Sequence, residues 1–294
     1  MKNETVKVKI KKEKHSSSNM LVMKSLLKTK SCIFGIVIIT MLVLLSIFAP
    51  LISPYSYTKI SILDAFATPS LEHPCGCDSM GRDILTRLLY GGRYSIGIGI
   101  LSTLLGTVGG VLIGSIAGFF GGKTDLVIMR VVDIFQALPS ILLAIVVAAV
   151  LGSGYIPTVL ALGVSSIPGT VRTMRASILT VRGMDYVEAA TSINCKSSRI
   201  IMNYVVPNAM APVLVSISNS ISSAVLAAAS LSYIGLGVQP PYPEWGAMLT
   251  NGKDYIMNYP HLTLFPGLFI MIFVLAFNLF SDALRDALDP KLKK

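Results

Sequence analysis

The stretch of sequence that decides the fold is residues 96–120, IGIGILSTLLGTVGGVLIGSIAGFF. It contains no Asp, Glu, Lys, Arg or His. A helix needs roughly 20 apolar residues to cross the hydrocarbon core of a bilayer. Because lipid cannot hydrogen-bond exposed backbone groups, a spanning segment of this kind must be helical. The stretch therefore predicts a transmembrane helix.

The composition extends this prediction to the whole chain of 294 residues. It is 53% hydrophobic and only 14% charged, whereas a soluble domain carries about 25% charged residues. We therefore expect an all-α membrane protein with about six transmembrane helices. The predicted spans are Ile33–Ile52, Ile96–Phe120, Leu126–Leu151, Ile156–Val171, Ala211–Leu236 and Thr263–Ser281.

The distribution of positive charge predicts the orientation. The net charge is +10, and nine lysines precede the first apolar run. No aromatic residue is interleaved with them, which argues against a nucleic-acid partner. With the N-terminus inside, 20 of the 25 Lys and Arg residues fall on the inner side. The positive-inside rule then places both termini in the cytoplasm, and we expect a multi-pass protein of the cytoplasmic membrane.

Three parts follow along the chain. Residues 1–30 form a basic cytoplasmic tail, residues 31–92 hold the first transmembrane helix and an external segment, and residues 93–294 form the core. The first apolar run is longer than a signal-peptide core and lacks a clean cleavage site, so we expect it to be retained. A cytoplasmic, amphipathic loop is expected at about residues 173–207.

Small residues mark one face of the second span. Gly106, Gly110, Gly114 and Gly118 recur at intervals of four. Residues at this spacing share one face of a helix, and small side chains allow a second backbone to approach closely. The stripe predicts a helix-packing groove.

The third span carries Arg130, Asp133 and Pro139. Residues three apart are neighbours on a helix, so Arg130 and Asp133 are expected to form a structural ion pair near the membrane interface. Pro139 is expected to kink the helix.

The sequence contains no candidate catalytic residues. The chain has three histidines, none in a span, no pair of carboxylates within the spans, and no phosphate-binding loop of its own. The sequence predicts neither an enzyme nor a metal site. A secondary transporter or channel remains a rival class, although such proteins place ionisable groups near the bilayer midplane.

The most informative cytoplasmic stretch is residues 185–194, DYVEAATSIN. It predicts a short helix, a turn near Asn194, and a second helix that stops at Pro207. Ala189 and Ala190 would leave one face flat enough for close docking, and Glu188 could orient the docked face. A short helix presented between two spans is suited to transmitting force from a partner.

This stretch resembles the Glu-Ala-Ala coupling loop of binding-protein-dependent ABC importer permeases. Asn194 stands where that family usually has Gly. Ala228 is a second departure, since many relatives carry Glu there. Three further segments resemble the C-type permeases for dipeptides, oligopeptides and nickel, and the likeness runs from about Lys30 to the end of the chain. They are residues 78–88 (DSMGRDILTRL), 231–246 (LSYIGLGVQPPYPEWG) and 282–290 (DALRDALDP).

The resemblance implies a type I ABC importer permease fold and a set of partners. These are a homologous second permease, two ATP-binding subunits that bind ATP and Mg, and an external solute-binding protein. This chain would hold no cofactor, and residues 93–294 would be the permease core. The residues implied to contact the ATPase are Asp185, Glu188, Ala189, Ala190, Asn194 and Pro207.

The solute is left open between two classes. The resemblance favours di- and oligopeptides, for which this chain would form half of the translocation path. Nickel or a metal chelate is the alternative, because His73, Cys75 and Cys77 place three soft ligands close together.

Overall fold

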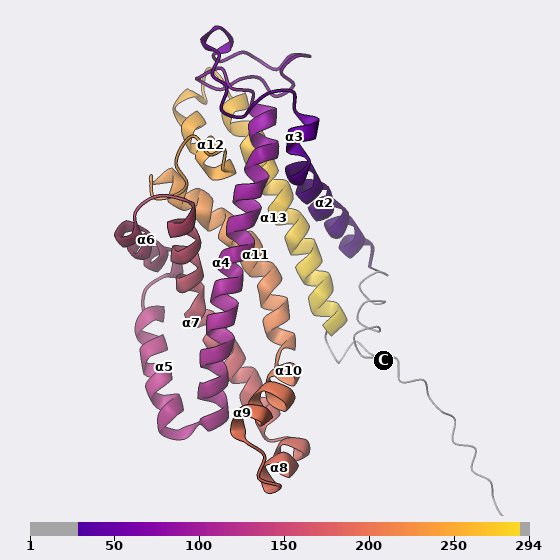
Figure 1. Cartoon of the computed structure of the whole chain (residues 1–294), viewed down its shortest axis with the longest axis vertical. Helices are drawn as coiled ribbons and strands as arrows, with labels where there is room; N and C mark the ends of the chain where they lie inside the picture. The colour runs from indigo at the N-terminus through magenta and orange to yellow at the C-terminus, as the bar shows by residue number, and fades with distance from the viewer. Residues whose placement is uncertain (1–28, 289–294) are drawn as a thin grey trace, which may run out of the picture.

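The computed structural model describes residues 29–288, and within that range the protein is almost wholly helical (Figure 1). The only β-type pairing there is an isolated bridge between Cys77 and Asp83. The predicted basic tail and the final residues, 289–294, lie outside the described range apart from Thr29 and Lys30. The elements are α2 (Lys30–Ile47), α3 (Ala49–Ile52), a 3-10 turn (Ile62–Asp64), α4 (Ile84–Phe120), α5 (Gly122–Gln136), α6 (Ser140–Leu151), α7 (Tyr155–Arg182), α8 (Asp185–Ser192), α9 (Ser197–Ile200), a π-turn (Ile201–Val205), α10 (Val206–Ala209), α11 (Ala211–Tyr233), α12 (Trp245–Gly252), a second 3-10 turn (Lys253–Tyr255) and α13 (His261–Leu288).

The long helices run side by side, and α4 lies at their centre (Figure 1). Its most extensive partner is α7, while α11 and α2 also pack against it. The other face of α2 contacts α13, which in turn packs on α11. Helices α8, α9 and α10 gather at one end of the molecule, and α12 lies towards the other end with the segment of residues 53–83 (Figure 1).

Length and apolar composition mark four described helices as membrane spans, namely α2, α4, α11 and α13. A fifth span results if the bent pair α5 and α6 is counted as one. The remaining predicted span, Ile156–Val171, lies inside α7. That helix continues to Arg182 and is less apolar, since it carries three arginines in its C-terminal half. The all-helical membrane class predicted from the sequence is confirmed.

Helix α4 begins at Ile84, twelve residues before the predicted start of the span at Ile96. The prediction was wrong because it read Arg87 and Arg93 as loop residues. Both guanidinium groups find carbonyl oxygens instead. Arg87 donates to the Tyr57 carbonyl at 2.8 Å, and Arg93 donates from two of its nitrogens to the carbonyls at the end of α2. The side chain of Asp83 accepts the Thr86 N–H and caps the helix.

The kink predicted at Pro139 is confirmed, since α5 and α6 meet there at 85°. The predicted pair of Arg130 with Asp133 is wrong. Asp133 accepts instead from Arg172 of α7, with 2.7 Å between Nη2 and Oδ1. A second cross-pair joins Asp125 to Arg175. The side chain of Asp133 is short and lies near α7. Arg172 of that helix therefore reaches its carboxylate more directly than Arg130, which is three residues away on the same helix as Asp133.

The glycine stripe of α4 lies against α7. A Cβ added at Gly110 would stand 2.3 Å from Thr170 Cβ, and one at Gly114 would stand 2.7 Å from the Val171 carbonyl oxygen. The same crowding occurs at Gly106 and Gly118. Two backbones this close gain dispersion contacts along their length, which is the main attraction available between helices in lipid.

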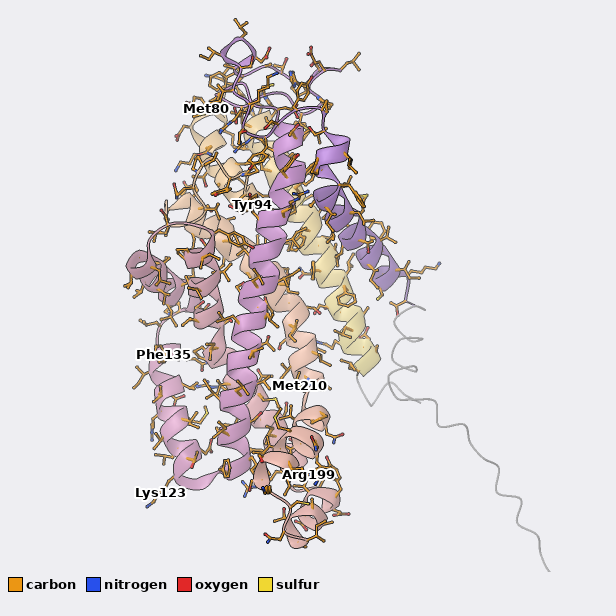
Figure 2. All side chains as sticks on the ribbon, in the orientation of Figure 1. Met80, Tyr94, Lys123, Phe135, Arg199 and Met210 are labelled. Carbon is orange, nitrogen blue, oxygen red and sulfur yellow. The ribbon has the colours of Figure 1, made fainter. Side chains whose placement is uncertain are left out.

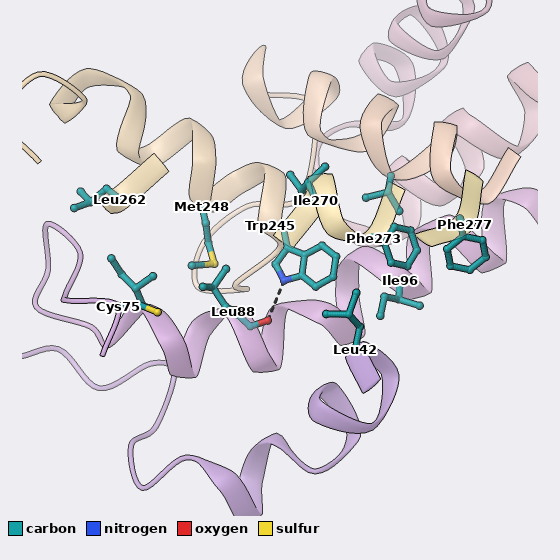
Figure 3. Close-up of a cluster of buried hydrophobic side chains, with 12 residues drawn as sticks. Leu42, Cys75, Leu88, Ile96, Trp245, Met248, Leu262, Ile270, Phe273 and Phe277 are labelled. Atoms are coloured by element: carbon teal, nitrogen blue, oxygen red, sulfur yellow. Dashed lines mark hydrogen bonds between the residues drawn. The ribbon is translucent and has the colours of Figure 1, made fainter. Parts of the chain in front are cut away.

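The end that carries α12 is held by one buried indole and one buried carboxylate. Trp245 is fully buried, and its Nε1 donates to the Leu88 carbonyl of α4 at 2.9 Å (Figure 3). Glu244, 1% exposed, caps α12 by accepting the amides of Gly246 and Ala247. It also accepts the hydroxyls of Ser95 on α4 and Ser232 on α11. These contacts fix α12 to two spans at once.

Gly110→Ala should lower the thermal unfolding midpoint of the purified protein by several degrees. Its new Cβ would overlap Thr170, and overpacking of this kind costs about 1–3 kcal/mol. Gly169→Ala is the matched control, because a Cβ at Gly169 meets nothing within 4 Å. Circular dichroism of both variants in the same detergent measures the midpoints. Equal midpoints would mean that α4 and α7 are not held by this backbone contact.

Candidate functional site

Helix α8 lies at the end of the molecule opposite the segment of residues 53–83 (Figure 1). One of its faces is anchored, because Val187 and Ala190 are buried in a cluster with Met174 and Ile178 of α7. The opposite face is open, since Ala189 and the first-turn residues next to it along that face are exposed. A helix that is fixed on one side and free on the other can receive a partner without being detached.

The predicted acidic residues stand on the open side of α8. Asp185 and Glu188 lie in its first turn and are exposed. Negative charge there is favoured by the partial positive charge of the helix N-terminus. Within residues 29–288 neither carboxylate forms an ion pair. Ala189 is also exposed, so α8 presents small and acidic side chains outward.

Asn194 ends α8 in the left-handed region, with φ +55°. Its N–H donates to the Thr191 carbonyl at 2.9 Å, and the N–H of Cys195 donates to the Ala190 carbonyl at 3.1 Å. These two bonds are those of a Schellman motif, in which the residue at C′ is usually Gly and sometimes Asn. The turn therefore explains why Asn can stand where the resembling family has Gly.

The second helix of the segment does not stop at Pro207, so that part of the prediction was wrong. Helical backbone runs from Ser197 to Ala209 and is interrupted only at Met210. Pro207 falls in the first turn of α10, directly after the π-turn Ile201–Val205. A π-turn is wider than a turn of α-helix, so its backbone hydrogen bonds join residues that are further apart in the chain. This change in pattern occurs just before Pro207, which has no N–H to donate. Residues 173–182, predicted to be loop, belong to α7.

A cavity of about 500 Å³ lies between α4, the bend of α5 and α6, α7 and α11. Its lining carries hydroxyl and amide groups and no ionisable side chain. The polar members are Ser102, Thr103, Gln136, Ser140, Ser165, Ser166, Ser220 and Ser223. The sequence analysis missed this cavity because its residues come from four separate segments. The signal that could have found it is the run of serines inside the apolar stretch of α11.

Cys75 and Cys77, in the segment of residues 53–83, are buried free thiols. Burial, followed by the nearby negative charge of Asp83, raises the pKa of Cys75 to about 11 and that of Cys77 to about 12. Both thiols therefore stay protonated at neutral pH, although metals bind the thiolate. His73 instead contacts Asp83, with 2.9 Å between Nδ1 and Oδ1. In the described range no three His, Cys, Asp or Glu side chains are grouped to hold a metal ion.

Ala228 is fully buried in an apolar cluster with Ile98 and Leu162. A carboxylate at this position would have to be desolvated among aliphatic side chains, which is costly without a partner. The apolar surroundings of residue 228 in this chain therefore suit an alanine.

A family model described as "Binding-protein-dependent transport system inner membrane component" matches residues 110–294. The chain belongs to this family. A second model, the N-terminal TM domain of oligopeptide transport permease C, matches residues 20–69. The chain is therefore a multi-pass transport permease subunit, which is a non-catalytic component.

Two curated relatives narrow the subfamily. The dipeptide transport system permease protein of Alkalihalophilus pseudofirmus is 41% identical over 270 residues, which is 92% of this chain and 89% of that one. The oligopeptide transport system permease protein of Bacillus subtilis is 40% identical over 265 residues, or 90% and 87% of the two chains. The predicted membership of the C-type permease family, which covers dipeptide, oligopeptide and nickel importers, is confirmed.

Among solved structures, the chain is similar to the inward-facing MetNI methionine ABC transporter, with a TM-score of 0.56. The match covers 69% of this chain and 96% of that one at 17% sequence identity. The type I ABC importer permease fold is thereby confirmed.

Asn194→Gly should leave the rate of amide hydrogen exchange in α8 unchanged, whereas Asn194→Val should accelerate it by several-fold or more. A β-branched residue at positive φ is strained by about 1–3 kcal/mol, and glycine enters this region freely. Exchange is measured by mass spectrometry on the purified protein. If both variants exchanged alike, the turn would not depend on the left-handed conformation of residue 194.

Proposed function

We propose that this chain forms half of the translocation path for di- and oligopeptides in an ATP-driven importer, and that it couples to an ATP-binding subunit through α8 and the turn at Asn194. The observation that carries the proposal is the double role of α7. Its C-terminal part packs on the buried face of α8, and its middle lines the hydroxyl-rich cavity.

This arrangement connects α8 mechanically to the cavity through α7. Ile178 contacts the α8 cluster, and Ser166 lines the cavity, so the two lie about 18 Å apart along one helix. The helix is unbroken between them although it contains Pro168, and it packs closely on α4. We expect it to transmit a displacement past this proline. Displacing α8 would therefore displace the cavity wall, and the chain itself would need no ATP chemistry.

The rest of the importer is proposed from the family. The partners are a homologous second permease, two ATP-binding subunits that hold ATP and Mg, and an external solute-binding protein. Peptide is the preferred solute because the relatives with about 40% identity are named for dipeptides and oligopeptides. The protonated thiols at Cys75 and Cys77 give the nickel alternative no support.

We place the end that carries α8 in the cytoplasm. Figure 2 shows Lys123 and Arg199 at that end and Met80 at the opposite end. Clustered Lys and Arg favour the cytoplasmic side of a membrane protein.

Cysteine labelling of intact cells tests this orientation. In a chain with Cys195→Ser, a membrane-impermeant maleimide should label Leu63→Cys and should not label Lys123→Cys. Leu63 is 99% exposed, and Lys123 at the start of α5 is also exposed and lies outside the proposed coupling contact, so the difference reports the side of the membrane rather than burial. Permeabilised cells, in which both sites should react, are the control. The reverse pattern in intact cells would refute the topology.

Glu188→Lys should abolish peptide uptake and weaken retention of the ATP-binding subunits about tenfold or more, while membrane insertion stays normal. The substitution places positive charge at a helix N-terminus and reverses the charge offered to the partner. Asp254→Lys is the matched reversal at the opposite end, where Asp254 is exposed. Co-purification from detergent measures retention, and proteoliposomes measure uptake. If Glu188→Lys retained the ATP-binding subunits as Asp254→Lys does, α8 would not be the coupling contact.

A further inference from the structure

Several hydroxyls of the cavity lining are already used within their own helices. Ser102, Ser165 and Ser166 each donate to a carbonyl of the helix that carries them, at 2.6, 2.9 and 2.8 Å respectively. A hydroxyl whose proton is committed can still accept a hydrogen bond, but it has no proton left to offer. These three side chains therefore present no free donor to a solute.

Three other side chains of the lining have no hydrogen-bond partner among residues 29–288, and none of the three is buried. Gln136 is the last residue of α5, while Ser220 and Ser223 lie on α11. The two serines are three residues apart, so they share one face of α11. Free polar groups are thus offered to the cavity from two different helices.

Gln136 carries the only amide side chain in this lining. It stands three residues before Pro139, where α5 and α6 meet at 85°, and Figure 2 labels its neighbour Phe135 at this end of α5. A glutamine amide has two N–H donors and one carbonyl acceptor. Within a membrane such a group must find a partner in protein or in a water-filled cavity. Gln136 is therefore placed to bind whatever enters the cavity.

The charges around the cavity narrow the chemistry of that ligand. The lining contains no ionisable side chain, and the nearest charged groups along the chain, Asp133 and Arg172, are paired with each other. Neither the termini nor the charged side chains of a peptide would find an opposite charge here. The peptide group is neutral, and it carries one donor and one acceptor, which complement the acceptor and the donors of a glutamine amide.

We propose that Gln136 binds a main-chain peptide group of the transported solute. This inference rests on the proposed function. The Nε2 group of Gln136 would donate to a carbonyl of the solute, and its Oε1 would accept an N–H of the solute. The solute would then lie between α5 and α11, where Ser220 and Ser223 present free hydroxyls.

Recognition of the main chain suits a transport path in two ways. Every peptide carries the same N–H and C=O groups, so hydrogen bonds to them give affinity without selecting a side chain. Hydrogen bonds between neutral groups are also weaker than those to charged groups, and a site that cargo must leave has to bind weakly.

A cycle between residue and ligand tests the proposal in the reconstituted importer with its binding protein. Uptake is measured for trialanine and for alanyl-lactyl-alanine, in which an ester oxygen replaces the N–H of the second residue. The wild type and Gln136→Met, whose side chain is similar in length but apolar, are compared. The preference for trialanine should fall about fivefold in the variant, because a neutral hydrogen bond is lost. The preference of the binding protein cancels, since the same binding protein serves both permeases.

Asn219→Leu is the matched control. Asn219 of α11 also carries a half-buried amide side chain without a partner in the described range, but it does not line the cavity. Its replacement should leave the preference for trialanine unchanged. An unchanged preference in Gln136→Met, with normal yield of the complex, would mean that Gln136 is merely hydrated and would refute the proposal. Failure of the wild type to take up any peptide would instead refute the proposed function.

A second measurement needs neither the binding protein nor uptake, so it also covers a Gln136→Met importer that assembles but transports poorly. In the purified importer with Cys195→Ser, a cysteine that replaces the half-buried cavity residue Ala224 is alkylated with a maleimide. Trialanine should slow this reaction more than alanyl-lactyl-alanine does, and Gln136→Met should remove the difference. Equal protection by the two solutes in the parent chain, or no protection by either, would overturn the proposal.

Discussion

The close contact between α4 and α7 is the constraint on which the other features depend. Because the two backbones meet at four glycines, the side chains on either side of the contact are brought together from distant parts of the chain. Ser102 and Thr103 on α4 thereby face Ser165 and Ser166 on α7 across one cavity. Helix α7 continues unbroken past Pro168 from that cavity to the cluster that holds α8.

The two ends of the molecule are built differently. At the end that carries α12, Glu244 and Trp245 tie this helix to neighbouring spans through buried hydrogen bonds. At the other end, α8 is held by the apolar contacts of Val187 and Ala190, while its acidic face is exposed. Directional bonds fix an element in one position, whereas apolar contacts tolerate small displacements. The difference is suited to a machine that is driven from the end that carries α8.

The polar side chains that line the cavity carry no formal charge. Hydroxyls such as those of Ser102 and Ser166 donate to carbonyls of their own helices, so they add polarity at little cost in lipid. The carboxylates of α5 lie outside the cavity lining, and Asp125 and Asp133 are paired with arginines of α7. The cavity is therefore polar but uncharged.

The sequence by itself determined the membrane class, the positions of most spans, the kink at Pro139 and the family. Long apolar runs, a proline and local motifs act over a few residues, and their physics needs no knowledge of distant contacts. Only the tertiary structure decided that Asp133 pairs with Arg172 rather than Arg130, since that choice depends on which helix lies nearby. It also decided that Arg87 belongs inside α4, because the Tyr57 carbonyl that satisfies it lies 30 residues away in the chain. The cavity could not be predicted for the same reason: its serines and Thr103 are ordinary residues of four separate segments until packing brings them around one space.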